Sequence, residues 1–270
     1  GLSKLENKAG IVKSLSEFGF IEVYGETDPT TPEMSGKIVK VPGRDGLWNF
    51  GKEMNAKSVA IPLLCVENDP IVMQQRFDEL NAFLFDEYGK PAVLKLMHDN
   101  WPDKYLMCEI AGQISPSRMY RVGSFTLNFI AYDPYKYSNV YSDEITWGSE
   151  VITFGSTYLL GHDNPSADMV ITAPGSVSVT VIGQAVKPII EITGSATDLV
   201  IIANGKSITV GTFADDVWVI ECDKYISYQN GVEKILDMGN FILKSGDNTL
   251  SFTGSGIDMT VSVKFRDKWL

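Results

Sequence analysis

The spacing of hydrophobic residues changes along the chain. Between residues 69 and 91, large apolar side chains recur at intervals of four, three and four, which is the spacing of one helical face. Asp69 followed by Pro70 predicts the N-cap and the first helical position, and Gly89 with Pro91 predicts the end of the helix. The residues on the predicted face are Met73, Phe77, Leu80 and Leu84.

Two aromatic residues of this helix, Phe83 and Phe85, lie off the main face. The helix is therefore predicted to cover apolar surface on more than one side, as a helix wedged between two surfaces would. Short apolar runs surround it and predict strands, two of which flank a turn at 42–46. The expected strands are 37–41, 47–50, 58–66, 93–97, 105–110 and 124–132.

Beyond a polar, proline-containing stretch at 133–139, no helical spacing recurs. Polar and apolar residues alternate at 176–181 and 257–265, and the pairs Asn204-Gly205 and Asn230-Gly231 predict type I′ hairpins. A further turn is expected at residues 254–256. About ten short strands predict an antiparallel β-sandwich. The fold class is thus mainly β, with an N-terminal α+β domain at 1–138 and a β-sandwich at 139–270.

Composition narrows the function. The 270 residues are 44% hydrophobic and 21% charged, which is typical of a folded globular protein, and the net charge of −11 argues against a protein that grips nucleic acid. Cys65, Cys108 and Cys222 are scattered and odd in number, so we expect buried thiols and folding in a cytosol. No apolar run reaches the ~18 residues of a membrane span, and no signal peptide is visible.

No arrangement of residues predicts catalysis. His98 and His162 each stand in His-Asp-Asn before a proline, which favours a capped turn, and the nucleophile pattern G-x-S-x-G is missing. Asp215 and Asp216 are adjacent, and adjacent side chains on a strand or loop point apart. They are therefore expected to be solvated charges of a turn rather than a catalytic acid/base pair. Residues 205–207 imitate a phosphate loop, but strands flank them and Val200 stands where the loop needs glycine.

Metal and sugar sites are also disfavoured. The oxygen-bearing residues at 163, 164 and 168 lack the twelve-residue calcium loop, and no zinc spacing occurs. Residues 147–150 and 162–165 resemble the two galectin motifs, but in reversed order. Ser166 and Ile152 replace the arginines that those motifs need. We therefore assign no catalytic, cofactor-binding or metal residue.

Four segments carry a resemblance to a known family. They are Ser16–Gly19, the turn Val41–Gly46, the capped helix from Asp69 to Phe85, and the aromatic exit Phe125–Tyr135. In this order and spacing they resemble the belt domain of siphophage distal tail proteins, the Dit family. The second half is similar, in architecture more than in motif, to the galectin-like β-sandwich of that family.

The resemblance implies a structural virion protein at the tip of a long non-contractile tail, folded in the host cytoplasm. The domain at 1–138 would form a hexameric ring that joins the tail tube protein to the tail-tip hub protein. The sandwich at 139–270 would anchor host-adsorption components such as a receptor-binding protein, and DNA would pass through the ring without specific binding. No enzyme activity, cofactor or membrane is implied. Whether the last strand, at 261–270, returns to the first domain stays open.

The alternative is a carbohydrate-binding protein, whose sandwich recognises host cell-wall polysaccharide through aromatic platforms. Against it, the second half has few tryptophans, and none has an obvious polar cluster beside it. A wall-degrading enzyme is a weaker option, because an acid/base pair is missing. The three tryptophans are Trp147, Trp218 and Trp269.

Overall fold

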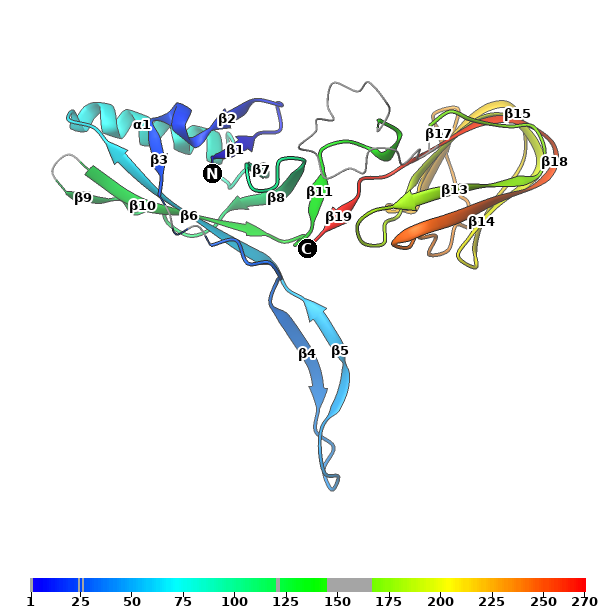
Figure 1. The fold of residues 1–270 in the computed structure, drawn as a ribbon, viewed down its shortest axis with the longest axis horizontal. Helices are drawn as coiled ribbons and strands as arrows, with labels where there is room; N and C mark the ends of the chain where they lie inside the picture. Colours follow the sequence, from blue (N-terminus) through cyan, green and yellow to red (C-terminus); the bar gives the residue numbers. More distant parts are fainter. Residues whose placement is uncertain (1, 24, 26, 120–121, 145–166) are drawn as a thin grey trace. The chain divides into compact units, whose positions relative to one another are not determined.

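The structure is a computed structural model that describes residues 2–23, 25, 27–119, 122–144 and 167–270. The chain separates into two compact units, residues 1–136 with Leu270 and residues 137–269. The described strands pair in sheets, mostly antiparallel, and one α-helix accompanies them, so the prediction of a mainly β fold is confirmed (Figure 1). Among the described helices none is long and apolar enough to cross a membrane.

Unit 1 is built on a sheet whose strands run in the order β2-β1-β7-β8-β10-β6-β3, with β9 added beside β10. Along β6 every second side chain from Lys57 to Cys65 is buried, and in β10 the buried set includes Phe125, Leu127 and Phe129. One face of the sheet therefore forms the core. The strands are β1 (Ser3–Glu6), β2 (Val12–Ser14), β3 (Phe20–Glu22), β6 (Lys57–Val66), β7 (Leu94–His98), β8 (Lys104–Ile110), β9 (Ser117–Met119) and β10 (Val122–Ala131).

Helix α1 (Pro70–Leu84) covers this core. The carboxylate of Asp69 accepts a hydrogen bond from the Ile71 amide at 2.8 Å, as the predicted N-cap requires. The predicted apolar face is buried: Met73, Phe77, Leu80 and Leu84.

The predicted end of α1 is wrong. The helix ends at Leu84, because Phe85 takes an extended backbone, and Gly89 lies in a separate turn held by the Asp86 carboxylate. The off-face Phe83 meets Phe18 edge to face at 5.5 Å, within the same unit. Phe18 is the last residue of the short helix η1 (Leu15–Phe18), so α1 covers apolar residues on more than one side, as predicted, and both contacts belong to the core of unit 1.

Unit 2 is a bent antiparallel sheet in the order β12-β18-β14-β15-β16-β17, with β13 also beside β18. The Asn-Gly turns have positive φ at Asn204, Gly205, Asn230 and Gly231, which confirms the type I′ prediction. Its strands are β12 (Met169–Ile171), β13 (Gly175–Val181), β14 (Ile189–Ala203), β15 (Lys206–Glu221), β16 (Ile226–Gln229), β17 (Val232–Lys234) and β18 (Gly246–Lys264). At the boundary, β11 (Lys136–Ser138) pairs with β19 (Lys268–Trp269), and η2 (Ser142–Glu144) follows β11.

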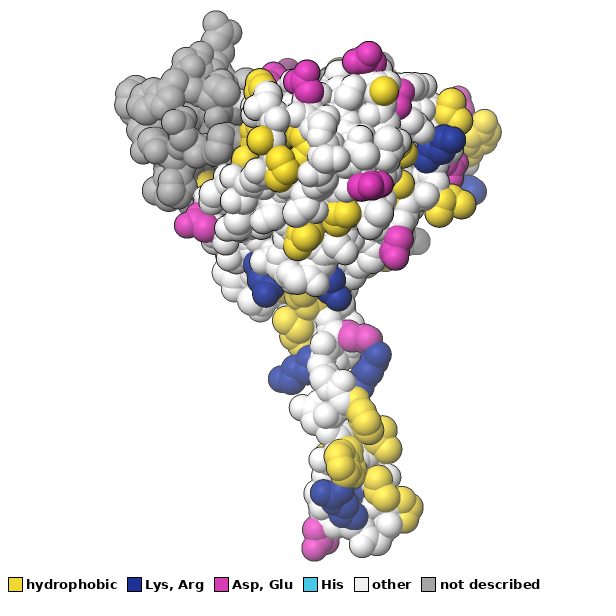
Figure 2. All heavy atoms as spheres, turned by 90° about the vertical axis from the view of Figure 1, so that its right-hand side faces the viewer, with side chains coloured by type: hydrophobic (Ala, Val, Ile, Leu, Met, Phe, Trp, Pro, Cys, Tyr) yellow, Lys and Arg dark blue, Asp and Glu magenta, His cyan; other side chains and the backbone are white. Residues whose placement is uncertain are grey.

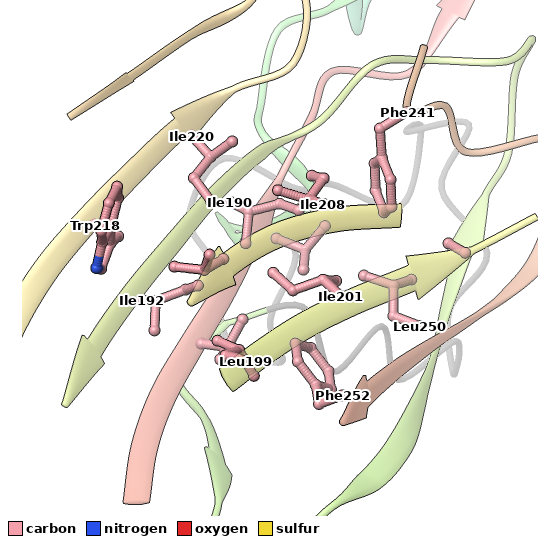
Figure 3. Close-up of a cluster of buried hydrophobic side chains, with 14 of the residues drawn as sticks. Ile190, Ile192, Leu199, Ile201, Ile208, Trp218, Ile220, Phe241, Leu250 and Phe252 are labelled. Atoms are coloured by element: carbon pink, nitrogen blue, oxygen red, sulfur yellow. The ribbon is translucent and has the colours of Figure 1, made fainter. Parts of the chain in front are cut away.

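The prediction of a turn at residues 254–256 is wrong, because strand β18 continues through these residues. Gly254 has φ +143°, and a Cβ there would lie 2.7 Å from the Thr197 carbonyl oxygen. The glycine therefore allows a bulge where β14 and β18 cross closely, rather than a hairpin. Such irregularities bend the long strands, and their inward side chains enclose one apolar core (Figure 3).

Candidate subunit interface on the β4–β5 hairpin

A long hairpin extends from unit 1 as a separate two-stranded sheet (Figure 1). It consists of β4 (Met34–Val39) and β5 (Trp48–Met54). The turn predicted at 42–46 joins them, with φ of +81° at Gly43 and +85° at Gly46. Both predicted strands are present, although each is shifted along the chain by a few residues.

The register gives the hairpin two apolar patches on opposite faces. Met34 pairs with Met54 near the root, and Val39 pairs with Trp48 near the tip. Paired residues share a face, but 34 and 39 are an odd number of positions apart on β4, so the two pairs face opposite ways. On β5 the change of face falls at a bulge, where Gly51 has φ +104°.

Every residue of both strands is exposed. The exposed fraction is 66% for Phe50, which stacks on Trp48 with ring centroids 6.5 Å apart. Figure 2 shows hydrophobic side chains gathered along the hairpin. A two-stranded hairpin by itself is marginally stable in water, and this one buries none of its apolar residues. The exposed set is Met34, Ile38, Val39, Val41, Leu47, Trp48, Phe50 and Met54.

The hairpin also differs in charge from the rest of the chain. Residues 34–54 contain four basic and two acidic side chains, a net charge of +2 in a chain of −11. The Arg44 guanidinium lies over the Trp48 ring, 4.2 Å from its centroid, and Lys37 pairs with Glu53. A basic arm on an acidic chain favours contact with acidic surfaces, including those of other copies.

A buried ionic cluster lies at the root of the hairpin. The two carboxylate oxygens of Asp28 meet Lys57 Nζ at 2.8 Å and Lys136 Nζ at 2.9 Å. Burial raises the pKa of Asp28, but hydrogen bonds and the charges of the two lysines outweigh this, so its pKa is lowered. Burial lowers the pKa of Lys57, whose side chain is fully covered. Sequence reasoning missed this cluster; its one visible signal is a lysine that opens the apolar run at 58–66.

The residues considered for chemistry do not come together. His98 is buried beside Trp101, and its Nδ1 accepts a hydrogen bond from the Asn100 amide at 3.1 Å, which is the predicted capped turn. Asp216 is held by Asn230 and Gln229. Within the described part of the chain, no three histidine, cysteine or acidic residues gather as metal ligands. Candidate residues outside the described part are Trp147, Glu150, His162, Asp163 and Asn164.

The thiols and one groove of unit 1 offer no reactive group. All three cysteines are free and buried, and burial raises the pKa of both Cys108 and Cys222 to about 12, so these thiols are not nucleophiles at neutral pH. A groove of about 500 Å³ crosses the sheet face opposite α1, and its lining carries no ionisable side chain. Its lining includes Val23, Pro62, Leu64, Ser124, Thr126 and Asn128.

The sandwich offers little as an aromatic platform. Trp218 is 4% exposed and meets Phe213 edge to face in the core of unit 2, so it cannot stack on a sugar (Figure 3). Tyr225 is exposed, but its hydroxyl accepts a hydrogen bond from Lys187 Nζ at 2.7 Å. Trp147 lies outside the described residues.

The exposed apolar surface of the hairpin marks it as a candidate contact surface. Residues 13–131 match the family of the phage tail protein RIFT-related domain. The chain therefore carries a phage tail domain that includes the hairpin and α1.

The fold of the whole chain gives the closer relation. It superimposes on the crystal structure of SPP1 Dit with a TM-score of 0.70 and 16% identity, over 100% of both chains. Two structures of the phage p2 baseplate match with TM-scores of 0.41 and 0.40 and 11% identity, over 97–98% of this chain and 97% of theirs. No curated protein sequence matches the chain. The chain thus has the fold of SPP1 Dit, which agrees with the predicted resemblance to the siphophage distal tail protein family.

Proposed function

We propose that this protein forms a hexameric ring at the tip of a long non-contractile phage tail, with the β4–β5 hairpin of each copy seated on the next. The observation that carries the proposal is the hairpin itself, which exposes eight large apolar side chains and has an apolar patch on each face. Exposed apolar surface of this extent marks a site that another protein covers.

The form of the contact favours a closed ring. A hairpin that leaves one copy and inserts into a different surface of the next is a heterologous contact, and heterologous contacts close into rings when the rotation allows it. The net charge of +2 on the hairpin, against the acidic remainder of the chain, supports contact between copies.

The finer roles follow the family. Unit 1 would join the tail tube protein to the tail-tip hub protein, and unit 2 would hold adsorption components, as the description of SPP1 Dit as a hub of an adsorption apparatus supports. The excess of acidic residues suits a ring that DNA crosses without being held. A scaffold of this kind needs no enzyme activity.

The test is the assembly state of the full chain. Sedimentation velocity over a concentration series, followed by negative-stain imaging, should show a six-fold ring in equilibrium with monomer. Adding the cognate tail tube protein should shift this equilibrium toward the ring. A chain that remains monomeric with the tube protein present, and that binds purified cell-wall polysaccharide, would overturn the proposal in favour of carbohydrate binding.

A further inference from the structure

The direction of the hairpin depends on very few contacts. β4 and β5 pair only with each other among the described strands. At their root, the Asn55 amide donates to the Glu33 carbonyl at 2.8 Å. One step further in, Thr27 and Ala60 exchange two backbone hydrogen bonds, at 2.9 and 3.0 Å. Beyond these, the Asp28 cluster links the chain that enters the hairpin to the chain that leaves it.

The cluster is placed to act as an anchor. Asp28 lies six positions before β4, and Lys57 lies three positions after β5, so their ion pair ties both ends of the hairpin together. Lys57 is also the first residue of β6, where it pairs with Ala131 of β10. The same ion pair therefore fixes the hairpin root to the main sheet of unit 1.

The composition of the cluster makes Asp28 indispensable to it. One carboxylate serves two ammonium groups, and the side chains of Lys57 and Lys136 are 0% and 11% exposed. Lys136 is held as well by the Trp101 ring, 4.9 Å from Nζ, whereas no described oxygen other than that of Asp28 lies within bonding distance of Lys57 Nζ. Replacing a whole buried ion pair by apolar groups is often neutral for stability, so the function of this pair is to be sought in the geometry that it specifies.

We propose that Asp28 and Lys57 are positioning residues for the hairpin: their buried ion pair, with Lys136, holds the angle at which β4–β5 leaves the sheet. This inference rests on the proposed ring. In that ring, a hairpin already held in the bound direction has little orientational freedom left to lose when it contacts the next copy. An arm held in its bound direction associates more strongly because less conformational entropy is lost on binding.

The angle can be measured within one chain, whether or not rings form. Spin labels are attached at Lys40→Cys in the hairpin and Glu87→Cys after α1, both exposed, while the three native cysteines are buried. The measurement uses the full chain with Trp48→Ala and Phe50→Ala, which removes two apolar side chains of the proposed interface and favours monomers. Double electron–electron resonance should give a narrow distribution of distances between the two spin labels in this parent protein.

In that background, Asp28→Asn should widen the distance distribution about twofold, because two buried ammonium groups lose their carboxylate. Lys57→Met is the second variant: it leaves the Asp28–Lys136 pair intact, suits a buried site and should also widen the distribution. Lys37→Met is the matched control, because it breaks only the exposed pair with Glu53, and it should leave the width unchanged.

The outcomes separate the two proposals. If Asp28→Asn does not fold, the width of the distance distribution in Lys57→Met tests the positioning role instead. A width in the folded variants equal to that of the parent, or an equal widening in Lys37→Met, would overturn the positioning role whatever the assembly state. With both apolar side chains restored, Asp28→Asn should lower the association constant about tenfold. If the restored parent never assembles, the ring proposal fails while the distance result still stands.

Discussion

Two hairpins of this protein, each with a bulged strand, have opposite surroundings. β14 and β15 form a hairpin whose strands are interrupted by bulges, as β5 is near the tip of β4–β5. In β14 the inward side chains, such as Ile192 and Ile201, are fully buried in unit 2 (Figure 3). In β5 the comparable side chains of Trp48 and Phe50 are exposed.

The difference shows which apolar surfaces the chain buries with its own residues. β14 lies between β15 and β18, so its apolar residues meet a core that the same chain provides. β4–β5 has no further strand on either side among the described residues. Mutations in the two hairpins should therefore act on different properties: folding in the first, association in the second.

The largest contrast should come from glycines at the two bulges. Gly194 of β14 has φ +138°, and a Cβ there would lie 2.2 Å from the Asp258 carbonyl oxygen; near Gly51 of β5 a Cβ meets nothing within 4 Å. We expect Gly194→Ala to lower the free energy of unfolding by more than the ~1–3 kcal/mol of backbone strain alone. Gly51→Ala should cost no more than that strain. Urea denaturation followed by circular dichroism measures both, and equal losses would contradict the contrast.

Neighbouring isoleucines test whether β14 is completed by its own unit. Ile201 is fully buried and Ile202 is 37% exposed on the opposite side of the strand. Ile201→Ala should lower the free energy of unfolding by about 2–5 kcal/mol, because it leaves a cavity. Ile202→Ala should cost less than about 1 kcal/mol. Denaturant unfolding of the two variants gives the comparison, and a small loss for Ile201→Ala would show that unit 2 packs loosely there.

The hairpin should show the reverse behaviour. Trp48→Ala with Phe50→Ala should change the free energy of unfolding by less than about 0.5 kcal/mol, since neither ring is buried in one copy. The association constant should fall at least about tenfold, because aromatic residues dominate interface energies. Ile71→Ala, an exposed apolar residue on α1, is the control. Sedimentation velocity measures association, and an equal loss in the control would remove the special role of the hairpin.

The smallest effects concern one buried acid in each unit. Asp267 accepts hydrogen bonds from the Ile182 and Gly183 amides, and burial raises its pKa above 3.8 despite them. The pKa of Asp28 is lowered below 3.8. Because the folded state binds the Asp267 proton more tightly, its stabilisation is present below pH 3.8 and is lost as the pH rises through the raised pKa. That of Asp28 is present above pH 3.8 and is lost as the pH falls.

Neutral variants of the two acids should therefore respond to pH in opposite ways. Asp267→Asn keeps an oxygen for both amides and should be at least as stable as the parent at neutral pH, with the difference closing in acid. Asp28→Asn should be less stable at neutral pH, and its deficit should close in acid. Thermal unfolding across an acid-to-neutral pH series distinguishes them. Parallel curves for the two variants would contradict the assigned shifts.

Local patterns predicted most of the individual elements. The spacing of Met73, Phe77, Leu80 and Leu84 correctly gives the buried face of α1, and the Asn-Gly pairs give two hairpins. Local signals failed where a distant segment decides. Gly254 resembles a turn glycine, but it serves a close crossing with β14.

The ion pairs at the hairpin root could not be predicted from local sequence patterns either. Asp28, Lys57 and Lys136 are far apart in the sequence, and only the pairing of β6 with β10 brings the two lysines to one carboxylate. No spacing rule connects such residues, because their contact depends on where the strands end. The predicted sequence motifs therefore located the hairpin turn but not its anchor.

The sequence alone determined the class of this protein. Alternation, capping residues and turn glycines act over a few positions, so the β-rich architecture, the helix and the hairpin turn follow from local chemistry. Tertiary structure decided which apolar residues are covered. Phe83 and Trp48 are both aromatic residues within predicted elements. Phe83 meets Phe18 in the core, whereas Trp48 is exposed on the hairpin. Burial depends on what the rest of the chain places opposite a side chain, and only the fold supplies that.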